Sequence, residues 1–214
     1  GGNGFYWKIA INPEDPELIE IRRGESGIRA WAAEPGEYYH SFDGAYGGLW
    51  RRNGRPPQLL AGVGFSAQGK FEGSYYRRTA ESRAPDLAWM FEGIEDQEIL
   101  GDFGFSGGGA AGFELDRADV RLGTPEEVRV VASSENHTSS FVLVPEEMLT
   151  HITNWPGEEE QQKLIRSDIV YFRTPSGGEV FSTGSITFCG SLPWNDFDNN
   201  ISRLLENVIR HFLQ

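Results

Sequence analysis

Apolar and polar positions along the chain predict several short strands and one amphipathic helix. The clearest pattern lies near the end, where apolar runs at residues 168–172 and 179–186 flank a turn sequence at residues 174–178. Two such runs joined by a Gly-rich turn predict a β-hairpin. Further on, Asp198 or Asn199 can cap a helix. Its apolar residues form one stripe, which we expect to pack on a sheet or on another subunit: Ile201, Leu204, Leu205, Val208, Ile209 and Phe212.

Shorter apolar runs predict further strands in the first two thirds of the chain. They lie at residues 5–11, 18–23, 59–65, 128–132 and 141–144. For residues 86–92 periodicity leaves a short helix and a strand equally open. The remaining stretches are expected to be loops or single helical turns, namely residues 34–57 (mostly loop), 101–112 (a long Gly-rich loop), 145–149 (a helical turn) and 158–162 (a solvated loop or helix start). The pattern therefore predicts an α/β chain with a β-rich mixed sheet and long Gly-rich loops.

The opening of the chain predicts a connection to something before it. Residues 1–4 read as a Gly-rich turn that leads directly into the aromatic and β-branched run at residues 5–11. Because a turn connects two elements, we expect an element upstream of Gly1. We also expect residues 5–11 to be an interior strand of a sheet whose other members are encoded ahead of it.

Composition and charge narrow the classes of function. Nineteen basic and 32 acidic side chains give a net charge of −13, which disfavours nucleic acid and anionic membrane surfaces as partners. Cys189 is the single cysteine, which excludes an internal disulfide and a Cys-rich metal site and fits a reducing compartment. No apolar run approaches the roughly 18 residues that a membrane helix needs. We therefore expect a cytoplasmic protein.

Three familiar patterns overlap between residues 102 and 112, but each lacks its structural context. The DFG triplet has no kinase motifs around it, Ser106 in a G-x-S-x-G pattern is followed by three glycines, and the G-x-G-x-x-G pattern does not continue into a long helix. The loop could instead bring its backbone close to a ligand, with Glu114 at its exit. The alternative is that the glycines serve tight turns and that Glu114 is a surface carboxylate.

A second candidate site follows the strand predicted at residues 128–132. Glu135 and His137 are two residues apart, so on an extended chain they project to the same side and could act as base and orienter. The alternative is a polar turn at the end of a strand whose groups are satisfied locally. His40 belongs to another polar and aromatic cluster, at residues 37–41.

Six motifs in order resemble the C-terminal region of the N,N-dimethylformamidase large-subunit family. They span most of the chain: residues 2–7 (GNGFYW), 31–40 (WAAEPGEYYH), 46–51 (YGGLWR), 108–112 (GGAAG), 134–137 (SENH) and 181–186 (FSTGSI). The last strand and helix also resemble the end of a class I amidotransferase-like, flavodoxin-type domain. The resemblance implies that residues 1–214 form such a C-terminal domain, incomplete at its N-terminus.

The same resemblance implies an activity, a cofactor and partners. It implies hydrolysis of small amides such as N,N-dimethylformamide to an amine and a carboxylate, at an iron ion held by two tyrosines and a glutamate. Those ligands would precede residues 2–7, so the chain would hold no metal ligand and would be inactive alone. The site residues carried over by the resemblance are Glu114, Glu135 and His137 as catalytic groups and Asn3, Tyr6 and His40 as substrate-binding groups.

The partners implied are the remainder of the same polypeptide or subunit and a homo- or hetero-oligomer. Two other classes of function stay open at this point. The scaffold could serve as a non-catalytic binding or assembly module, or its six tryptophans could serve glycan binding.

Overall fold

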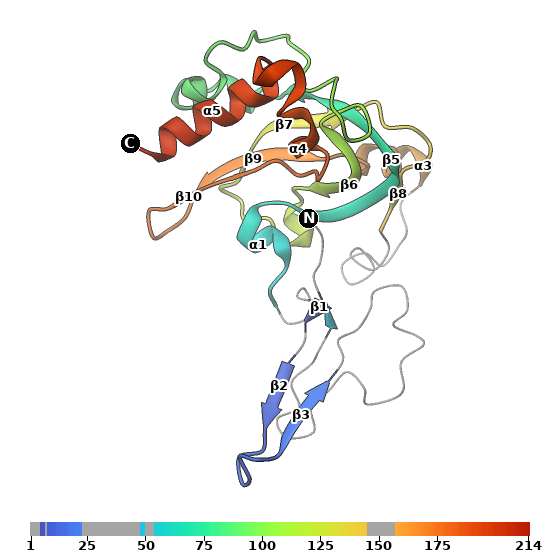
Figure 1. Ribbon diagram of the computed structural model, residues 1–214, viewed down its shortest axis with the longest axis vertical. Helices are drawn as coiled ribbons and strands as arrows, with labels where there is room; N and C mark the ends of the chain where they lie inside the picture. Colours follow the sequence, from blue (N-terminus) through green and yellow to red (C-terminus); the bar gives the residue numbers. More distant parts are fainter. Residues whose placement is uncertain (1–4, 7, 23–47, 50–53, 145–156) are drawn as a thin grey trace.

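The computed structural model describes residues 5–6, 8–22, 48–49, 54–144 and 157–214. The main body is built on a six-stranded sheet in the order β10-β9-β7-β5-β6, with β8 also paired to β5 (Figure 1). Its strands are β5 (Gly64–Arg78), β6 (Ala111–Arg117), β7 (Arg129–Glu135), β8 (Val142–Leu143), β9 (Asp168–Arg173) and β10 (Glu179–Ser182). Two short pairs lie outside it, β1 (Phe5–Tyr6) with β4 (Gly48–Leu49) and β2 (Lys8–Ile11) with β3 (Ile19–Arg22).

Helices cover the sheet in short pieces, apart from one longer helix at the end of the chain. They are α1 (Pro57–Ala61), α3 (Glu158–Leu164), α4 (Phe188–Ser191), α5 (Asn200–Phe212) and the 3₁₀ helices η3 (Glu81–Arg83), η4 (Pro85–Phe91), η5 (Val120–Leu122) and η6 (Trp194–Phe197). The helices of the described ranges are all too short or too polar to cross a membrane.

Strand β5 organises the sheet because three other strands pair with it. β6 pairs along it from Gly64 to Ser74, β8 pairs at Ala67 and Gln68, and β7 pairs with its last four residues. The register with β6 shifts twice, between Phe65 and Ala67 and between Gln68 and Gly73. Such bulges bend a strand and strengthen its twist, and β5 follows a strong curve across the body in Figure 1.

The main core lies between the sheet, η4 and α5. Strands β5, β7 and β9, helix η4 and helices α4 and α5 all contribute buried side chains to one cluster. Its largest fully buried members are Tyr76, Leu87, Met90, Leu100, Ile169, Ile201 and Leu204. Strand β9 is buried on both faces, because Ile169 and Tyr171 enter this cluster while Val170 packs with Val63 and Ala118 on the other side.

The predicted C-terminal helix and hairpin are confirmed. Asn199 caps α5, accepting a hydrogen bond from the Ser202 backbone N–H through its side chain at 2.9 Å. The predicted stripe divides into two, because Ile201, Leu204 and Val208 are buried in the core while other members stay exposed. β9 and β10 form an antiparallel hairpin over the turn at residues 174–178, with the left-handed conformation taken by a glycine.

Several weaker predictions are also confirmed, and one open choice is decided. Residues 18–23, 128–132 and 141–144 contain β3, β7 and β8, and residues 158–162 begin α3. The segment at residues 86–92 is neither an α-helix nor a strand, since η4 is a 3₁₀ helix. The helical turn predicted at residues 145–149 lies outside the described residues.

Residues 59–65 were expected to form a strand, and this prediction is wrong over most of their length. They begin inside α1 and enter β5 only at Gly64. Proline at the first helical position favours the helix start, and Gly62 ends it in the left-handed conformation at φ 77°. The short apolar run therefore reflects a helical turn that packs beside β5.

The opening run at residues 5–11 is not an interior strand among the described residues. It contributes β1 and β2, each paired antiparallel with one later strand of this chain. The β2–β3 hairpin lies at the end of the molecule away from the six-stranded sheet (Figure 1), and Ile11 is 60% exposed. An aromatic and β-branched run fits either arrangement, because β propensity does not distinguish a sheet interior from a hairpin.

The β-rich character is confirmed, whereas the flavodoxin-type ending is not. Every strand pairing in the described ranges is antiparallel. A flavodoxin-type sheet is built from parallel strands joined by helices. Here β10 lies at one edge, next to β9, and α5 then covers the sheet.

Candidate active-site pocket

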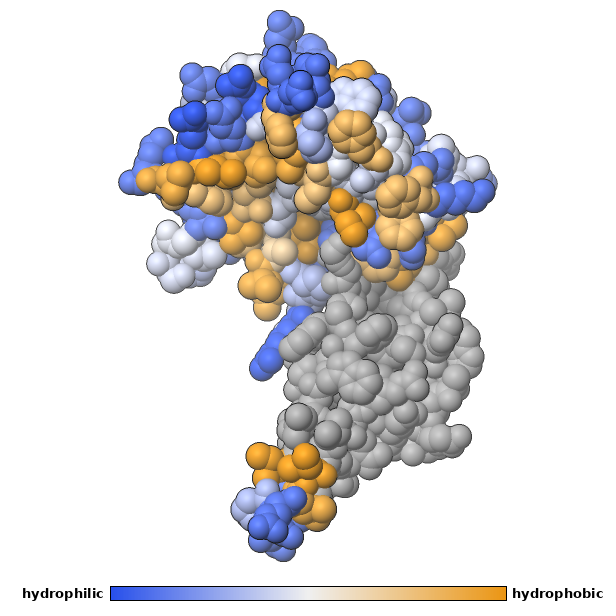
Figure 2. All heavy atoms as spheres, in the orientation of Figure 1, coloured by the Kyte–Doolittle hydropathy of each residue, from blue (hydrophilic) through white to orange (hydrophobic). Residues whose placement is uncertain are grey.

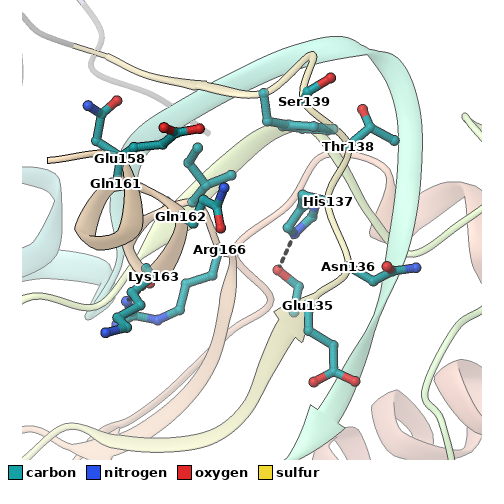
Figure 3. Close-up of a pocket in the computed structure, with 13 residues that line it drawn as sticks. Glu135, Asn136, His137, Thr138, Ser139, Glu158, Gln161, Gln162, Lys163 and Arg166 are labelled. Atoms are coloured by element: carbon teal, nitrogen blue, oxygen red, sulfur yellow. Dashed lines mark hydrogen bonds between the residues drawn. The ribbon is translucent and has the colours of Figure 1, made fainter.

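The strongest candidate site forms where β7 ends and the chain turns back on itself. Glu135 is the last residue of β7, and Asn136 takes the left-handed conformation at φ 62°. Asparagine tolerates this conformation better than most residues do. The turn brings His137 back toward the strand, where its Nε2 lies 2.6 Å from Ser134 Oγ (Figure 3).

A chain of buried hydrogen bonds fixes the state of the His137 ring. The Ser167 backbone N–H donates to Ser134 Oγ at 2.7 Å, and Tyr76 connects to Ser167 Oγ at 2.9 Å. Because Ser134 Oγ already accepts one hydrogen bond, we assign its own hydrogen to His137 Nε2, which places the ring proton on Nδ1. Nδ1 is buried and has no hydrogen-bond partner within the described part of the chain.

Burial lowers the pKa of His137 to about 4 and outweighs the opposing effect of Glu72. The imidazole is therefore neutral near pH 7 and can accept a proton without first losing one. Glu72 itself accepts hydrogen bonds from the hydroxyls of Ser140 and Thr138, which hold the pKa of its carboxyl below the usual range. These bonds tie the turn after β7 to β5.

The depressed pKa of His137 predicts a loss of stability in acid. Because the folded state favours the neutral ring, this contribution is complete above the unfolded pKa near 6.5 and is lost as pH falls toward 4. The shift corresponds to about 3 kcal/mol. We expect the unfolding free energy of the wild type to fall more between pH 7 and pH 4 than that of His137→Gln, which keeps an acceptor for Ser134 but does not titrate.

Urea unfolding at a series of pH values measures this difference. Parallel pH profiles for the two proteins would show that His137 is not held neutral by the fold. A variant that is less stable at every pH but has the flatter profile agrees with the prediction.

A cavity of about 630 Å³ lies between this turn and α3. Its lining mixes hydrogen-bonding, charged and apolar side chains: Ser134, Glu135, Asn136, His137, Thr138, Ser139, Phe141, Glu158, Gln161, Gln162, Lys163, Ile165 and Arg166. Arg166 is held in the wall by Asp168, at 3.0 Å from its Nε, and by the backbone carbonyl of Lys163. The pocket therefore has fixed polar walls.

Glu135 and His137 line the same pocket, but each has a different partner. Glu135 forms an exposed ion pair with Arg77, and its carboxylate points away from the His137 ring in Figure 3. The left-handed turn at Asn136 replaces the extended chain that the sequence interpretation assumed. A joint role as base and orienter stays a prediction without a hydrogen bond between the two.

Glu114 lies on a different surface of the sheet. It is half-buried on β6, and Gln68 is its register partner on β5. Their neighbours Ala67 and Leu115 enter the buried cluster beneath α3, so alternation along the strands turns Glu114 to the opposite face. Phe113, directly before it, has a φ of 60°, a conformation that bulky residues rarely adopt.

Glu114 also affects a buried neighbour on its own strand. Burial raises the pKa of Asp116 to about 6, and the negative charge of Glu114 contributes in the same direction. The structure thus brings Glu135 and His137 to one pocket and leaves Glu114 outside the set of residues that line it.

The three predicted substrate-binding residues lie in the N-terminal part. Tyr6 is in β1, where its backbone pairs with Gly48 of β4. Asn3 and His40 lie outside the described residues. Their roles remain predictions.

The Gly-rich loop packs on β5 through its glycines. A Cβ atom at Gly112 would lie 2.2 Å from the backbone oxygen of Glu72, and one at Gly109 would lie 2.3 Å from that of Ser74. No side chain fits at such distances. At these positions the glycines serve close packing within the chain, which is the structural alternative that the sequence left open.

The described residues do not supply a metal centre. They contain no group of three or more His, Cys, Asp or Glu side chains placed to hold a metal ion. An iron site held by two tyrosines and a glutamate therefore does not fit this part of the molecule. Iron remains an expectation from the family resemblance.

Ser134 and Glu72 are parts of this pocket region that the sequence interpretation missed. The signal for Ser134 is its spacing of three residues from His137 across an asparagine, a residue type that often reverses a chain. Glu72 gives no such signal, because it meets Thr138 and Ser140 only through the pairing of distant strands.

Comparison with known families agrees with the motif series. The family described as N,N-dimethylformamidase beta subunit-like, C-terminal, matches residues 1–200, and the chain belongs to this family. Its relatives include the N,N-dimethylformamidase beta subunits of an Alcaligenes species and of Paracoccus aminophilus. Each is 41% identical over 212 residues, which is 99% of this chain. The chain spans 27% of the length of these relatives.

Proposed function

We propose that this chain is the C-terminal part of an enzyme subunit that hydrolyses small amides, such as N,N-dimethylformamide, to an amine and a carboxylate. The observation that carries the proposal is 41% identity over 99% of the chain to two N,N-dimethylformamidase beta subunits. Because the chain spans 27% of those relatives, the activity belongs in this proposal to a longer polypeptide.

The pocket beside His137 supports an uncharged polar ligand. Asn136, Gln161 and Gln162 each offer both donors and acceptors, and apolar atoms of Phe141 complete the lining. His137, whose pKa burial lowers to about 4, is available as a neutral base near pH 7. An amide carries one carbonyl acceptor and no charge, so it matches such a lining without the burial of an ion.

Further parts of the proposal concern the complete protein. We propose that iron is bound by ligands outside this chain, where it would polarise the amide carbonyl. We also propose a cytoplasmic location, assembly into homo- or hetero-oligomers and an amidotransferase-like relationship whose parallel strands come from elsewhere in the polypeptide. The single cysteine favours a reducing compartment.

The test is amine release from N,N-dimethylformamide and other small formamides by the full-length polypeptide with its associated subunits. We expect His137→Gln and Glu114→Gln to lower kcat by about a hundredfold, as loss of a general acid or base does. Glu159→Gln, an exposed position on α3, serves as the control and is expected to keep full activity.

The outcomes separate the parts of the proposal. No amine release from any small amide by the wild type would refute amide hydrolysis and favour a binding or assembly role. Normal activity in both variants would leave the reaction in place and remove His137 and Glu114 from it.

A further inference from the structure

An apolar groove runs along the outer side of α5. It has a volume of about 500 Å³, and Leu192, Phe197, Leu205, Ile209 and Leu213 supply its apolar lining. Leu213 is 80% exposed, Phe197 63% and Ile209 50%. Figure 2 shows apolar side chains gathered over the C-terminal end of α5. We call this surface the α5 groove.

An aromatic cluster adjoins the groove through the segment before α5. The Trp194 ring lies 5.9 Å from that of Phe103 and 5.2 Å from that of Phe105, measured between ring centres. Phe105 is 70% exposed and Trp194 40%. Large aromatic side chains at this exposure are characteristic of protein interfaces rather than of a solvated surface.

The segment that joins the two parts is strained. Asn195, Asp196 and Phe197 all have positive φ, at 51°, 52° and 67°. The left-handed conformation costs about 1–2 kcal/mol for each residue that is not glycine. Asn199 holds the turn through hydrogen bonds from Nδ2 to the carbonyls of Trp194 and Leu192, at 2.7 and 3.0 Å. Strain that is held in place in this way is typical of functional surfaces.

Acidic groups border the same surface. Asp102, Asp196 and Asp198 are exposed beside the aromatic cluster. On α5, Arg203 and Arg210 both pair with Glu206, so their charges are largely balanced locally. The border therefore has a negative potential, in keeping with the net charge of −13.

We propose that the α5 groove and the adjoining aromatic cluster bind a second, different polypeptide of the enzyme, through an apolar segment flanked by lysine or arginine. The inference rests on the proposed function, in which the chain is part of one subunit of a hetero-oligomer. A second copy of the chain fits poorly. In a symmetric contact the same acidic border would face itself, and like charges across an interface cost several kcal/mol.

The test uses the full-length polypeptide and its companion subunit, both taken from the enzyme purified from its native source and expressed separately. Combining Ile209→Glu and Leu213→Glu is expected to weaken binding of the companion at least about tenfold, because charges then enter the apolar contact. Leu60→Glu is the matched control, since Leu60 on α1 is 81% exposed, and it is expected to leave binding unchanged. Titration calorimetry measures both.

Two further variants make the result independent of the helix. Phe105→Ser, in the loop that contacts Trp194, is expected to weaken binding without altering α5. Asp196→Lys with Asp198→Lys is expected to slow association with the companion and to reduce its dependence on salt, as loss of electrostatic steering does.

Several results would overturn the inference. These are a native enzyme with only one kind of chain, unchanged companion binding in the α5 and Phe105 variants, or a loss of self-association of the polypeptide alone. Protection of α5 from hydrogen exchange before the companion is added would assign the groove to the same polypeptide instead. Amine release measured on the same samples keeps the tests apart: assembly without amide hydrolysis refutes only the proposed function.

Discussion

Replacing Asp168 with alanine is expected to lower the unfolding free energy by about 3–5 kcal/mol, the range for removing one partner of a buried charged network. Asp168 is fully buried. Its Oδ1 accepts hydrogen bonds from Ser133 Oγ at 2.6 Å and from Arg166 Nε at 3.0 Å. Its Oδ2 accepts one from the Ala118 backbone N–H at 2.9 Å. Without the carboxylate, these donors are left unsatisfied between β6, β7 and β9.

Urea denaturation of the wild type and the variant measures the loss. Asp86→Ala is the control, because Asp86 also pairs with an arginine, Arg129, but is exposed at the surface. Exposed ion pairs contribute little, so the control is expected to lose much less stability. Equal losses in the two variants would contradict the structural role of Asp168.

Replacing Leu204 with alanine is expected to lower the unfolding free energy by about 2–5 kcal/mol. Leu204 is fully buried on the inner face of α5, in the main core with Met90 of η4. Alanine is the better helix former, so the loss comes from packing and not from helix propensity.

The same urea measurement on Ile209→Ala provides the comparison on the outer face of α5. Ile209 is half exposed in this chain, and we expect a loss below about 1 kcal/mol there. If Ile209→Ala destabilised the chain as much as Leu204→Ala, the division of α5 into an inner and an outer apolar face would be wrong.

The elements that the sequence predicted well carry their signals locally. Helix α5 has its cap at Asn199 and its apolar residues within fourteen positions, and the β9–β10 hairpin has its turn glycine between two apolar runs. A cap, a stripe or a turn acts through neighbours in sequence, so it can be recognised without the rest of the fold.

Strand β5 could not be predicted in the same way. Between Gly64 and Arg78 it includes Gly69, Gly73 and the charged Lys70 and Glu72, which interrupt any regular alternation of apolar and polar residues. It is extended because β6, β7 and β8 pair with it, and those contacts come from residues 111–143. Tertiary pairing here overrides local propensity.

The candidate site was predicted in its residue types more than in its arrangement. Glu135 and His137 do line one pocket, but the left-handed conformation of Asn136 directs them to separate partners. The separation of Glu114 from that pocket depends on which face of β6 it occupies, and a strand bulge such as the one opposite Gly73 changes that face.

The central place of β5 has a consequence for biosynthesis. A ribosome completes β5 before any of its three partner strands exists, and the last of them, β8, ends at Leu143. Until then the nascent chain holds a long segment with unsatisfied backbone groups, and closing contacts over such distances along the chain makes folding slow. The glycines and charges of β5 lower its tendency to aggregate during that interval.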